Sequence, residues 1–325
     1  MLNVSHLTKK YGNNLAVDDL SMTLESGQVY GFLGPNGAGK STTLNMITGY
    51  LGATDGFVEV NGLRMDKEAE KAKAFIGYLP EKPPLYEEMT AREYLEFTYD
   101  LKGLGKEIKD KKALAQAKKE AVDESIEALR LESVEGRLIR NLSKGFKQRV
   151  GVAEAILGKP EIIILDEPTV GLDPAQLKDI RELIRNLGKD HTVIFSSHIL
   201  SEVSAVCDYV FIISDGKLVA SESVNNLSMA FNKSQVISLT VKGNEEAAEK
   251  LSGISGVSSI TSAAIDEETV SFKLAFEGDE DRRAEVIRYC VYNDIALLEI
   301  TASRSSLEDI FLNLTEHNSE EEGDN

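Results

Sequence analysis

The feature that most constrains this fold is a glycine-rich segment that separates an apolar stretch from a helical one. The apolar residues 28–33 (QVYGFL) predict a short buried strand, and the glycine-rich residues 34–39 cannot continue it. Beyond this loop, apolar residues recur at the helical spacing of Leu44, Ile47 and Leu51. Strand, glycine loop and helix in this order predict the first unit of an α/β sheet.

Three further apolar runs predict more strands of the same sheet. They occupy residues 161–165, 192–196 and 209–213, and helical patterns alternate with them. This alternation predicts a largely parallel sheet with helices on both faces. We place this first domain at residues 1–220.

A helical insertion interrupts the predicted sheet. A capping-box pattern, TARE at residues 90–93, opens its first helix. The predicted apolar face of that helix comprises Tyr94, Phe97 and Leu101. Residues 106–131 are highly charged but amphipathic, which predicts a second helix. We expect a helical subdomain over about residues 86–157.

The character of the chain changes after the first domain. Small and polar residues at 221–234 predict a linker. The patterns that follow predict strand, helix, strand, strand, helix and strand, which is the ferredoxin-like order. We therefore expect a small α+β ferredoxin-like domain at residues 235–316. An acidic tail at residues 317–325 is expected to be disordered.

Charge and apolar content exclude several classes of protein. The 325 residues carry 36 basic and 54 acidic side chains, a net charge of −18, which disfavours nucleic acid as the main partner. No apolar run approaches the ~18 residues that a membrane-spanning helix needs, and the first residues lack a signal-peptide pattern. We expect a cytoplasmic chain, with Cys207 and Cys290 as packed thiols.

The glycine loop carries the strongest chemical signal. Residues 34–41 (GPNGAGKS) fit the phosphate-loop pattern G-x-x-x-x-G-K-[ST], in which backbone N–H groups and a helix N-terminus surround a phosphate. Lys40 is expected to reach the β- and γ-phosphates, and the Ser41 hydroxyl is expected to ligate Mg²⁺. The predicted nucleotide-binding residues of the loop are Asn36, Gly37, Ala38, Gly39, Lys40, Ser41 and Thr42.

Two acids and a histidine follow later predicted strands. Asp166 and Glu167 come directly after the apolar strand ending at Leu165, at the sheet edge where ligands of open α/β sheets bind. We expect Asp166 to hold Mg²⁺ through water and Glu167 to orient and polarise the attacking water. His198 follows the next strand and is expected to donate a hydrogen bond to a γ-phosphate oxygen. The predicted catalytic residues are Glu167, His198 and Lys40.

Five motifs in this order resemble those of the ATP-binding cassette (ABC) ATPases. They are the phosphate loop, the segment 142–149 (LSKGFKQR), the strand ending in the two acids, the segment 171–173 (GLD) and His198. The resemblance covers about residues 1–217. It implies a P-loop NTPase fold with a helical subdomain, ATP and Mg²⁺ as cofactors, and ATP hydrolysis.

The resemblance also implies a head-to-tail dimer with two ATP molecules at its interface. Tyr11 would stack on the adenine. Ser143, Lys144 and Gly145 of one subunit would close on the γ-phosphate bound by the other, as the helix start at Ser143 suits an anion. Asp173 would lie at the same interface and couple the two sites.

This sequence departs from the family pattern at two places. Lys144 and Phe146 stand where the family signature usually has glycine and glutamine. Glu81 stands where glutamine is common beside Mg²⁺ and the attacking water. A carboxylate can ligate the metal, but it also adds negative charge near Asp166 and Glu167, so both a ligand role and a non-ligand role stay open for Glu81.

Short motifs narrow the resemblance to one branch of the family. Residues 79–81 (LPE), 142–145 (LSKG) and 307–312 (LEDIFL) are similar to ATPase subunits of bacterial exporters whose membrane protein is a separate chain. That branch includes exporters of drugs, antibiotics, sodium and polysaccharides, and components of gliding motility. The implied partners are a transmembrane permease and a second ATPase subunit, in a homodimer or heterodimer on the inner face of the cell membrane.

Two other functions compete with the transporter hypothesis. A soluble ABC ATPase acting on DNA or ribosomes is disfavoured by the single cassette and the acidic balance. A regulatory module with little turnover is favoured by Lys144 and Glu81, but the acid at Glu167 argues against it. A gel-shift experiment and an ATPase assay separate these alternatives.

Overall fold

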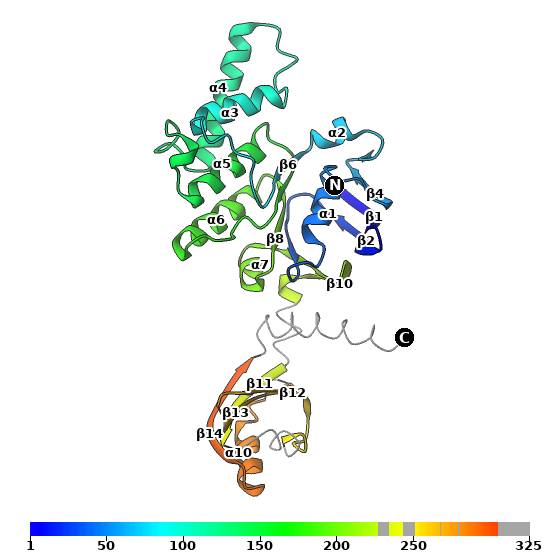
Figure 1. Cartoon of the computed structure of the whole chain (residues 1–325), viewed down its shortest axis with the longest axis vertical. Coiled ribbons are helices and arrows are strands. Elements are labelled where there is room, and N and C mark those ends of the chain that lie inside the picture. The colour runs from blue at the N-terminus through cyan, green and yellow to red at the C-terminus, as the bar shows by residue number, and fades with distance from the viewer. Residues whose placement is uncertain (227–233, 243–250, 267, 279, 305–325) are drawn as a thin grey trace. The chain divides into compact units, whose positions relative to one another are not determined.

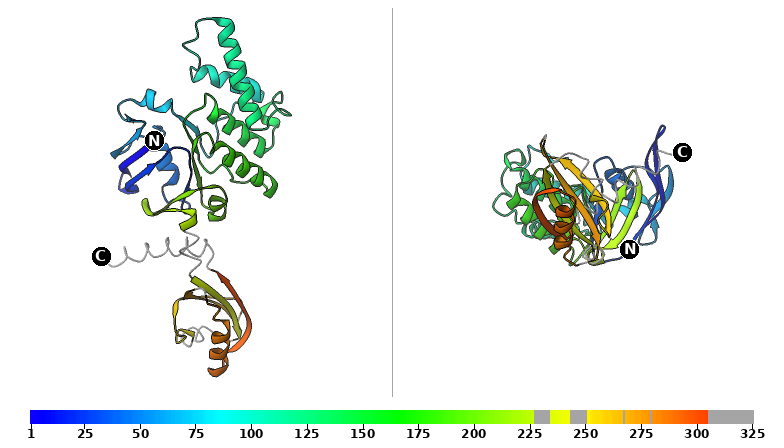
Figure 2. Two further views of the ribbon diagram at one scale, coloured as in Figure 1. Left: turned by 180° about the vertical axis from the view of Figure 1, so that it is seen from behind. Right: turned by 90° about the horizontal axis from the view of Figure 1, so that it is seen from below.

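The computed structural model describes residues 1–226, 234–242, 251–266, 268–278 and 280–304. By its contacts the chain divides into two compact units, Met1–Ser223 and Val224–Asn325, which are described separately (Figure 1). Figure 2 shows both units from two further sides. Among the described residues, no helix combines the length and the apolar character needed to cross a bilayer.

A six-stranded sheet forms the centre of the first unit. Five strands run parallel, and β10 pairs antiparallel with β9 at one edge. In spatial order the strands are β10 (Lys217–Ser223), β9 (Tyr209–Ser214), β3 (Val29–Leu33), β8 (Thr192–Ser197), β7 (Ile162–Leu165) and β6 (Ile76–Leu79). Every residue of β3, β7 and β8 is buried, as expected for central strands with both faces covered. The prediction of a largely parallel sheet is confirmed.

The pairing register places three strand ends at one edge of this sheet. Leu33 at the end of β3 pairs with Ser197 at the end of β8, and Leu165 at the end of β7 pairs with Phe195. The loops that leave these strands therefore emerge side by side. Helices α1 (Lys40–Ile47) and α7 (Leu200–Val206) follow two of those loops.

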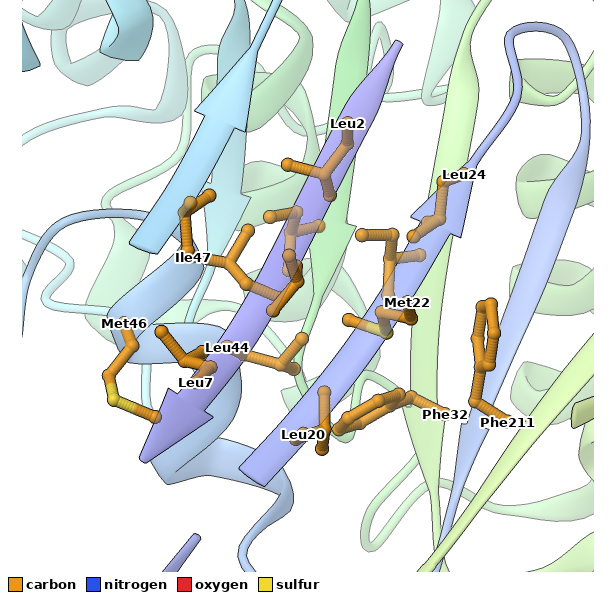
Figure 3. Close-up of a cluster of buried hydrophobic side chains, with 14 of the residues drawn as sticks. Leu2, Leu7, Leu20, Met22, Leu24, Phe32, Leu44, Met46, Ile47 and Phe211 are labelled. Carbon is orange, nitrogen blue, oxygen red and sulfur yellow. The ribbon is translucent and has the colours of Figure 1, made fainter. Parts of the chain in front are cut away.

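A second sheet, which the sequence analysis did not predict, covers α1. It is antiparallel, in the order β2 (Asn14–Leu24), β1 (Leu2–Tyr11), β4 (Asp55–Val60) and β5 (Leu63–Arg64). Its inward side chains meet Leu44, Met46 and Ile47 of α1 and reach Phe32 and Phe211 of the central sheet (Figure 3). This shared core holds the glycine loop and α1 between two sheets.

The helical insertion contains α3 (Ala91–Leu101), α4 (Lys111–Ala128) and α5 (Lys144–Ile156). The predicted capping box is confirmed, because the Thr90 hydroxyl accepts from Glu93 N–H and the Glu93 carboxylate accepts from Thr90 N–H. The predicted apolar face of α3 is wrong for Phe97 and Leu101, which are 36% and 71% exposed.

The buried stripe of α3 lies one residue further along the helix than predicted. Tyr94, Leu95, Thr98 and Tyr99 face inward. The buried face is the one that α3 presents to its neighbours α4 and α5. The Tyr94 hydroxyl donates to the Glu154 carboxylate on α5, while the Phe97 ring lies edge-on against the ring of the exposed Tyr86. Burial and the bond to Glu154 raise the pKa of Tyr94, so the phenol stays protonated as a donor.

The second unit contains one antiparallel sheet and a helix. Its strands are β11 (Ser234–Lys242), β12 (Val257–Ala264), β13 (Thr269–Glu277) and β14 (Ala296–Arg304), in the spatial order β12-β13-β11-β14. Helix α10 (Arg283–Tyr292) packs Val286 and Cys290 against Phe272 and Leu274. The helix expected near residues 244–251 and the acidic tail at 317–325 lie almost wholly outside the described residues.

The expected packed thiols are found. Cys207 and Cys290 are free and buried, and burial raises the pKa of each thiol. Neither belongs to a metal cluster, since the described residues hold no group of three or more His, Cys, Asp or Glu side chains arranged for a metal.

A close approach at Gly77 joins β6 to α5 and allows a test of this packing. A Cβ atom on Gly77 would lie 2.0 Å from the carbonyl oxygen of Ala155, which is backbone and cannot rotate away. We expect Gly77→Ala to reduce the free energy of unfolding by about 2 kcal/mol or more, measured by urea denaturation.

Gly136→Ala is the matched control for that substitution. A Cβ on Gly136 meets no atom within 4 Å, and the position needs no left-handed backbone. Its effect should stay within about 0.5 kcal/mol. Equal stability of the two variants would contradict the close packing of β6 on α5.

Candidate functional site

The glycine loop between β3 and α1 forms a cradle of backbone groups. Gly37 and Gly39 adopt φ angles of 87° and 100°, which favour glycine. A Cβ on Gly39 would lie 2.5 Å from the carbonyl oxygen of Ala16, so this position also lacks room for a side chain. Helix α1 begins at Lys40 without a side-chain cap, which leaves its first N–H groups suited to an anion.

Lys40 is held in a buried position inside this cradle. Its side chain is only 5% exposed, and its ammonium donates to the carbonyl oxygens of Gly34 at 2.8 Å and Pro35 at 3.2 Å. The same ammonium lies 3.3 Å from Oε1 of Glu167. The loop therefore fixes one positive charge where a bound phosphate would reach it.

The carboxylate of Glu167 bridges two partners. While Oε1 faces Lys40, Oε2 lies 3.0 Å from Nδ1 of His198. The backbone of Glu167 has a φ of 48°, a left-handed conformation that costs on the order of 1 kcal/mol or more in a residue other than glycine. This strained turn after β7 aims the side chain back toward the glycine loop.

Ser196 fixes the two acids at the end of β7. Its hydroxyl donates to Oδ1 of Asp166 at 2.7 Å and accepts from the backbone N–H of Glu167 at 2.7 Å. Asp166 is almost fully buried, and burial of Tyr78, together with the nearby charge of Asp166, raises the pKa of Tyr78. One serine on β8 thus holds the Asp166 carboxylate and the backbone of Glu167.

These segments enclose a pocket of about 430 Å³. Its walls come from the glycine loop, the start of α1, the end of β6 and the loops after β7 and β8. The lining residues are Ala16, Asn36, Gly37, Gly39, Lys40, Ser41, Thr42, Glu81, Glu167, Val170 and His198. All three predicted catalytic residues and most of the predicted loop residues therefore lie around one space.

Three predicted residues of this site do not line the pocket. Ala38 is buried, and its carbonyl oxygen accepts from Gly216 N–H at 3.0 Å. Asp166 is buried next to Glu167, and its carboxylate accepts from the Ser196 hydroxyl. Tyr11 is 49% exposed at the end of β1, with the Lys9 ammonium 5.3 Å from its ring centroid, so its stacking on a base stays a prediction.

The residues predicted to act on a partner's nucleotide gather elsewhere, at the starts of α5 and α6 (Pro174–Leu187). Ser143 caps α5 by accepting from Phe146 N–H at 3.3 Å, and Asp173 caps α6 by accepting from Gln176 N–H at 2.9 Å. A Cβ on Gly145 would lie 2.9 Å from Gln176. A Cβ on Gly171 would likewise clash with the side chain of Lys144. The start of α5 and the segment that leads into α6 therefore pack closely on each other.

Four buried polar residues that hold the segment of the two acids in place were not predicted from the sequence. Ser196, Ser197, Thr169 and Glu202 are buried polar residues close to the pocket but outside its lining. Two serines at the end of an otherwise apolar strand, and one acid within an apolar helical pattern, were the available signals. Ala16 and Val170, which line the pocket, carried no such signal.

Comparison with known protein families identifies the fold. The model of the ABC transporter family matches residues 17–170. A solved structure of an ATP-binding subunit of an ABC transporter is 29% identical, with a TM-score of 0.61 over 71% of this chain and 93% of that chain. A dimeric, post-hydrolysis ATP-binding cassette bound to ADP and Pi is 25% identical, with a TM-score of 0.61 over 69% of this chain and 99% of that one.

Two bacterial relatives align with nearly the whole chain. The linearmycin resistance ATP-binding protein LnrL of Bacillus subtilis (strain 168) is 34% identical over 316 residues, covering 97% of this chain and 98% of that protein. The bacitracin transport ATP-binding protein BcrA of Bacillus licheniformis is 34% identical over 316 residues, covering 97% of each. The chain therefore belongs to the ATP-binding subunits of ABC transporters, and it is an ATPase.

Proposed function

We propose that the pocket binds Mg²⁺ and ATP, and that Glu167 directs the water that attacks the γ-phosphate. The observation that carries this proposal is the position of the Glu167 carboxylate, between the Lys40 ammonium and the His198 ring. A carboxylate fixed there can orient water, while Lys40 and His198 stabilise charge on the phosphate oxygens.

The loop suits a triphosphate in charge and in shape. Asn36, Gly37, Gly39, Lys40, Ser41 and Thr42 line the pocket, and Ala38 contributes to the loop backbone. In the structure the Lys40 ammonium contacts Glu167, so a γ-phosphate would compete with this carboxylate for the same charge. Tyr11 is proposed to stack on the adenine from the exposed end of β1.

The residues beside the loop fit a magnesium ion bound together with the nucleotide. Such an ion needs only one or two protein carboxylates, with phosphate oxygens and water completing its shell. We assign the Ser41 hydroxyl, Asp166 and Glu81 to it, since Ser41 and Glu81 line the pocket and Asp166 immediately precedes Glu167, which also lines it. When bound, the ion would neutralise phosphate charge.

The second part of the machinery is proposed to act between two subunits. Ser143, Lys144 and Gly145 lie at the start of α5, outside the pocket of their own chain. In a dimer this helix N-terminus and the Lys144 ammonium would face the partner's γ-phosphate, with Asp173 of α6 beside them. Support comes from the dimeric solved cassette, which is 25% identical to this chain.

The ATPase is proposed to drive a separate membrane permease of an exporter from the cytoplasmic face of the membrane. ATP-binding subunits of ABC transporters act as dimers with such permeases. The names of two relatives at 34% identity, one for bacitracin transport and one for linearmycin resistance, support export of antibiotic-like compounds.

We propose the following domains: an ABC ATPase domain at residues 1–220 with its helical subdomain at about 86–157, a linker at 221–234, a ferredoxin-like domain at 235–316 and a tail at 317–325. Because β10 continues to Ser223 and β11 begins at Ser234, the linker is limited to the residues between these two strands. The strand order β12-β13-β11-β14, antiparallel throughout, supports the ferredoxin-like assignment. If the four strands are numbered by their order in the chain, their spatial order is 2-3-1-4. Helix α10 connects the third strand, β13, to the fourth, β14.

The role of Glu167 can be tested by removing its charge. We expect Glu167→Gln to keep ATP binding, because Lys40 retains Gly34 and Pro35 as partners and loses a competitor of phosphate. ATP hydrolysis should fall by about a hundredfold or more, measured as phosphate release. Size-exclusion chromatography should show a dimer of this variant in the presence of ATP.

Lys40→Ala is the contrasting variant, because it should lose ATP binding itself. Binding of the fluorescent analogue mant-ATP separates the two effects. Hydrolysis by Glu167→Gln at the rate of the unmutated protein would show that another group directs the water.

The assignment of Glu81 to the metal gives a second test. An amide oxygen also ligates Mg²⁺, so Glu81→Gln should keep the hydrolysis rate within about threefold, while Glu81→Ala should lower apparent Mg²⁺ affinity by about tenfold. Magnesium titration of ATPase activity measures both. Glu88, exposed and paired with Arg140, gives the control Glu88→Gln. No loss of Mg²⁺ affinity in Glu81→Ala would remove Glu81 from the metal site.

A further inference from the structure

Glu202 is a buried carboxylate that contacts three separate segments behind the pocket. It belongs to α7 and is 3% exposed. Its Oε2 accepts from the hydroxyl of Thr169 at 2.6 Å and from the hydroxyl of Ser197 at 3.0 Å. Its Oε1 lies 3.8 Å from a terminal guanidinium nitrogen of Arg181 on α6.

Two of these partners lie close in the chain to residues of the proposed hydrolytic machinery. Thr169 is in the loop after β7, two positions beyond Glu167. Ser197 immediately precedes His198, and its hydroxyl also accepts from Ile199 N–H at 3.0 Å. A single oxygen atom of Glu202 therefore joins the segment that carries the acid to the segment that carries the histidine.

The two serines at the end of β8, Ser196 and Ser197, contact different parts of the segment that carries the acids. Successive side chains of a strand point to opposite faces of the sheet. Ser196 can therefore bind Asp166 and Glu167 directly, whereas Ser197 faces α7 and reaches the loop after β7 only through Glu202. Without Glu202, the loop after β7 would keep its hydrogen bonds to Ser196 on one face of the sheet and lose its link to Ser197 on the other.

The hydrogen bonds and the nearby charge around Glu202 hold its partners in fixed positions. Hydrogen bonds to an ionised carboxylate are shorter and stronger than neutral ones, and a buried charge without partners is costly. Arg181 supplies the nearby positive charge, and its own Nε is buried without a hydrogen-bond partner among the described residues. If Thr169 or Ser197 moved away from Glu202, a buried hydroxyl and the buried carboxylate would lose a hydrogen bond to each other.

We propose that Glu202 is a positioning residue for ATP hydrolysis, which sets the Glu167 carboxylate and the His198 ring at their working separation by binding Thr169 and Ser197. This inference rests on the proposed roles of Glu167 and His198. Glu202 touches neither ATP nor water in this scheme, so it should affect turnover far more than nucleotide binding.

The test compares full-length variants in steady-state ATPase assays. Turnover is normalised to the number of ATP sites titrated with mant-ATP, so that misfolded protein does not lower the apparent rate. We expect Glu202→Ala to reduce kcat by about tenfold or more, with KM and the mant-ATP affinity within about threefold. Glu202→Gln keeps an oxygen that can accept both hydroxyls, and it should retain kcat within about threefold.

A second route removes the bonds of Thr169 and Ser197 to Glu202, together with the bond from Ile199 N–H to Ser197, and leaves Glu202 in place, in case Glu202→Ala does not fold. The double variant Thr169→Val with Ser197→Ala should lose kcat to a similar extent. The matched control is Thr192→Val at the opposite end of β8, where a buried hydroxyl accepts from Gly27 N–H. The control loses one buried hydrogen bond on the same strand, and its kcat should not change.

The results separate this inference from the proposed function. If Glu167→Gln hydrolyses ATP at the unmutated rate, the proposed role of Glu167 fails. If Glu167→Gln is inactive while Glu202→Ala and the double variant keep normal kcat, only the positioning role of Glu202 is overturned. A reduced kcat in Thr192→Val equal to that in Glu202→Ala would also overturn it, because general loss of stability would then explain both.

Discussion

The carboxylate of Glu167 is the point on which the rest of the site depends. It lies between the Lys40 ammonium and the His198 ring, and so connects the glycine loop with the loops after β7 and β8. These three segments are far apart in the chain. They meet because β3, β8 and β7 are neighbours that end at the same edge of a parallel sheet. An ion pair this well buried is favourable only when hydrogen bonds complete it, and the carbonyl oxygens of Gly34 and Pro35 do so for Lys40.

The scaffold around this contact is built to resist movement. Helix α1 is packed between the central sheet and the antiparallel sheet, through side chains such as Leu44 and Ile47 (Figure 3). Ser196 binds both acids from β8, and Glu202 links Thr169, in the loop after β7, to Ser197 on the other face of the same strand. Preorganised polar groups of this kind lower a reaction barrier because they need not rearrange during the reaction.

The residues proposed to act in trans are organised differently from those of the pocket. Ser143 and Asp173 each cap a helix, and Lys144 crosses Gly171 between the two helix starts. A shift at one helix start would therefore be transmitted to the other. In the dimer proposed above, this arrangement would let the segment at Ser143 and Asp173 of one subunit respond together.

Local patterns in the sequence were sufficient for the glycine loop, the buried strands, the capping box at Thr90 and the position of the two acids. Each of these depends on backbone geometry or apolar spacing within a few residues, which the sequence contains directly. Tertiary structure alone decided which face of α3 is buried, because that depends on where α4 and α5 pack against α3, and this packing leaves Phe97 and Leu101 exposed. It also decided the antiparallel sheet and the role of Glu202, since both depend on contacts between segments that the sequence separates.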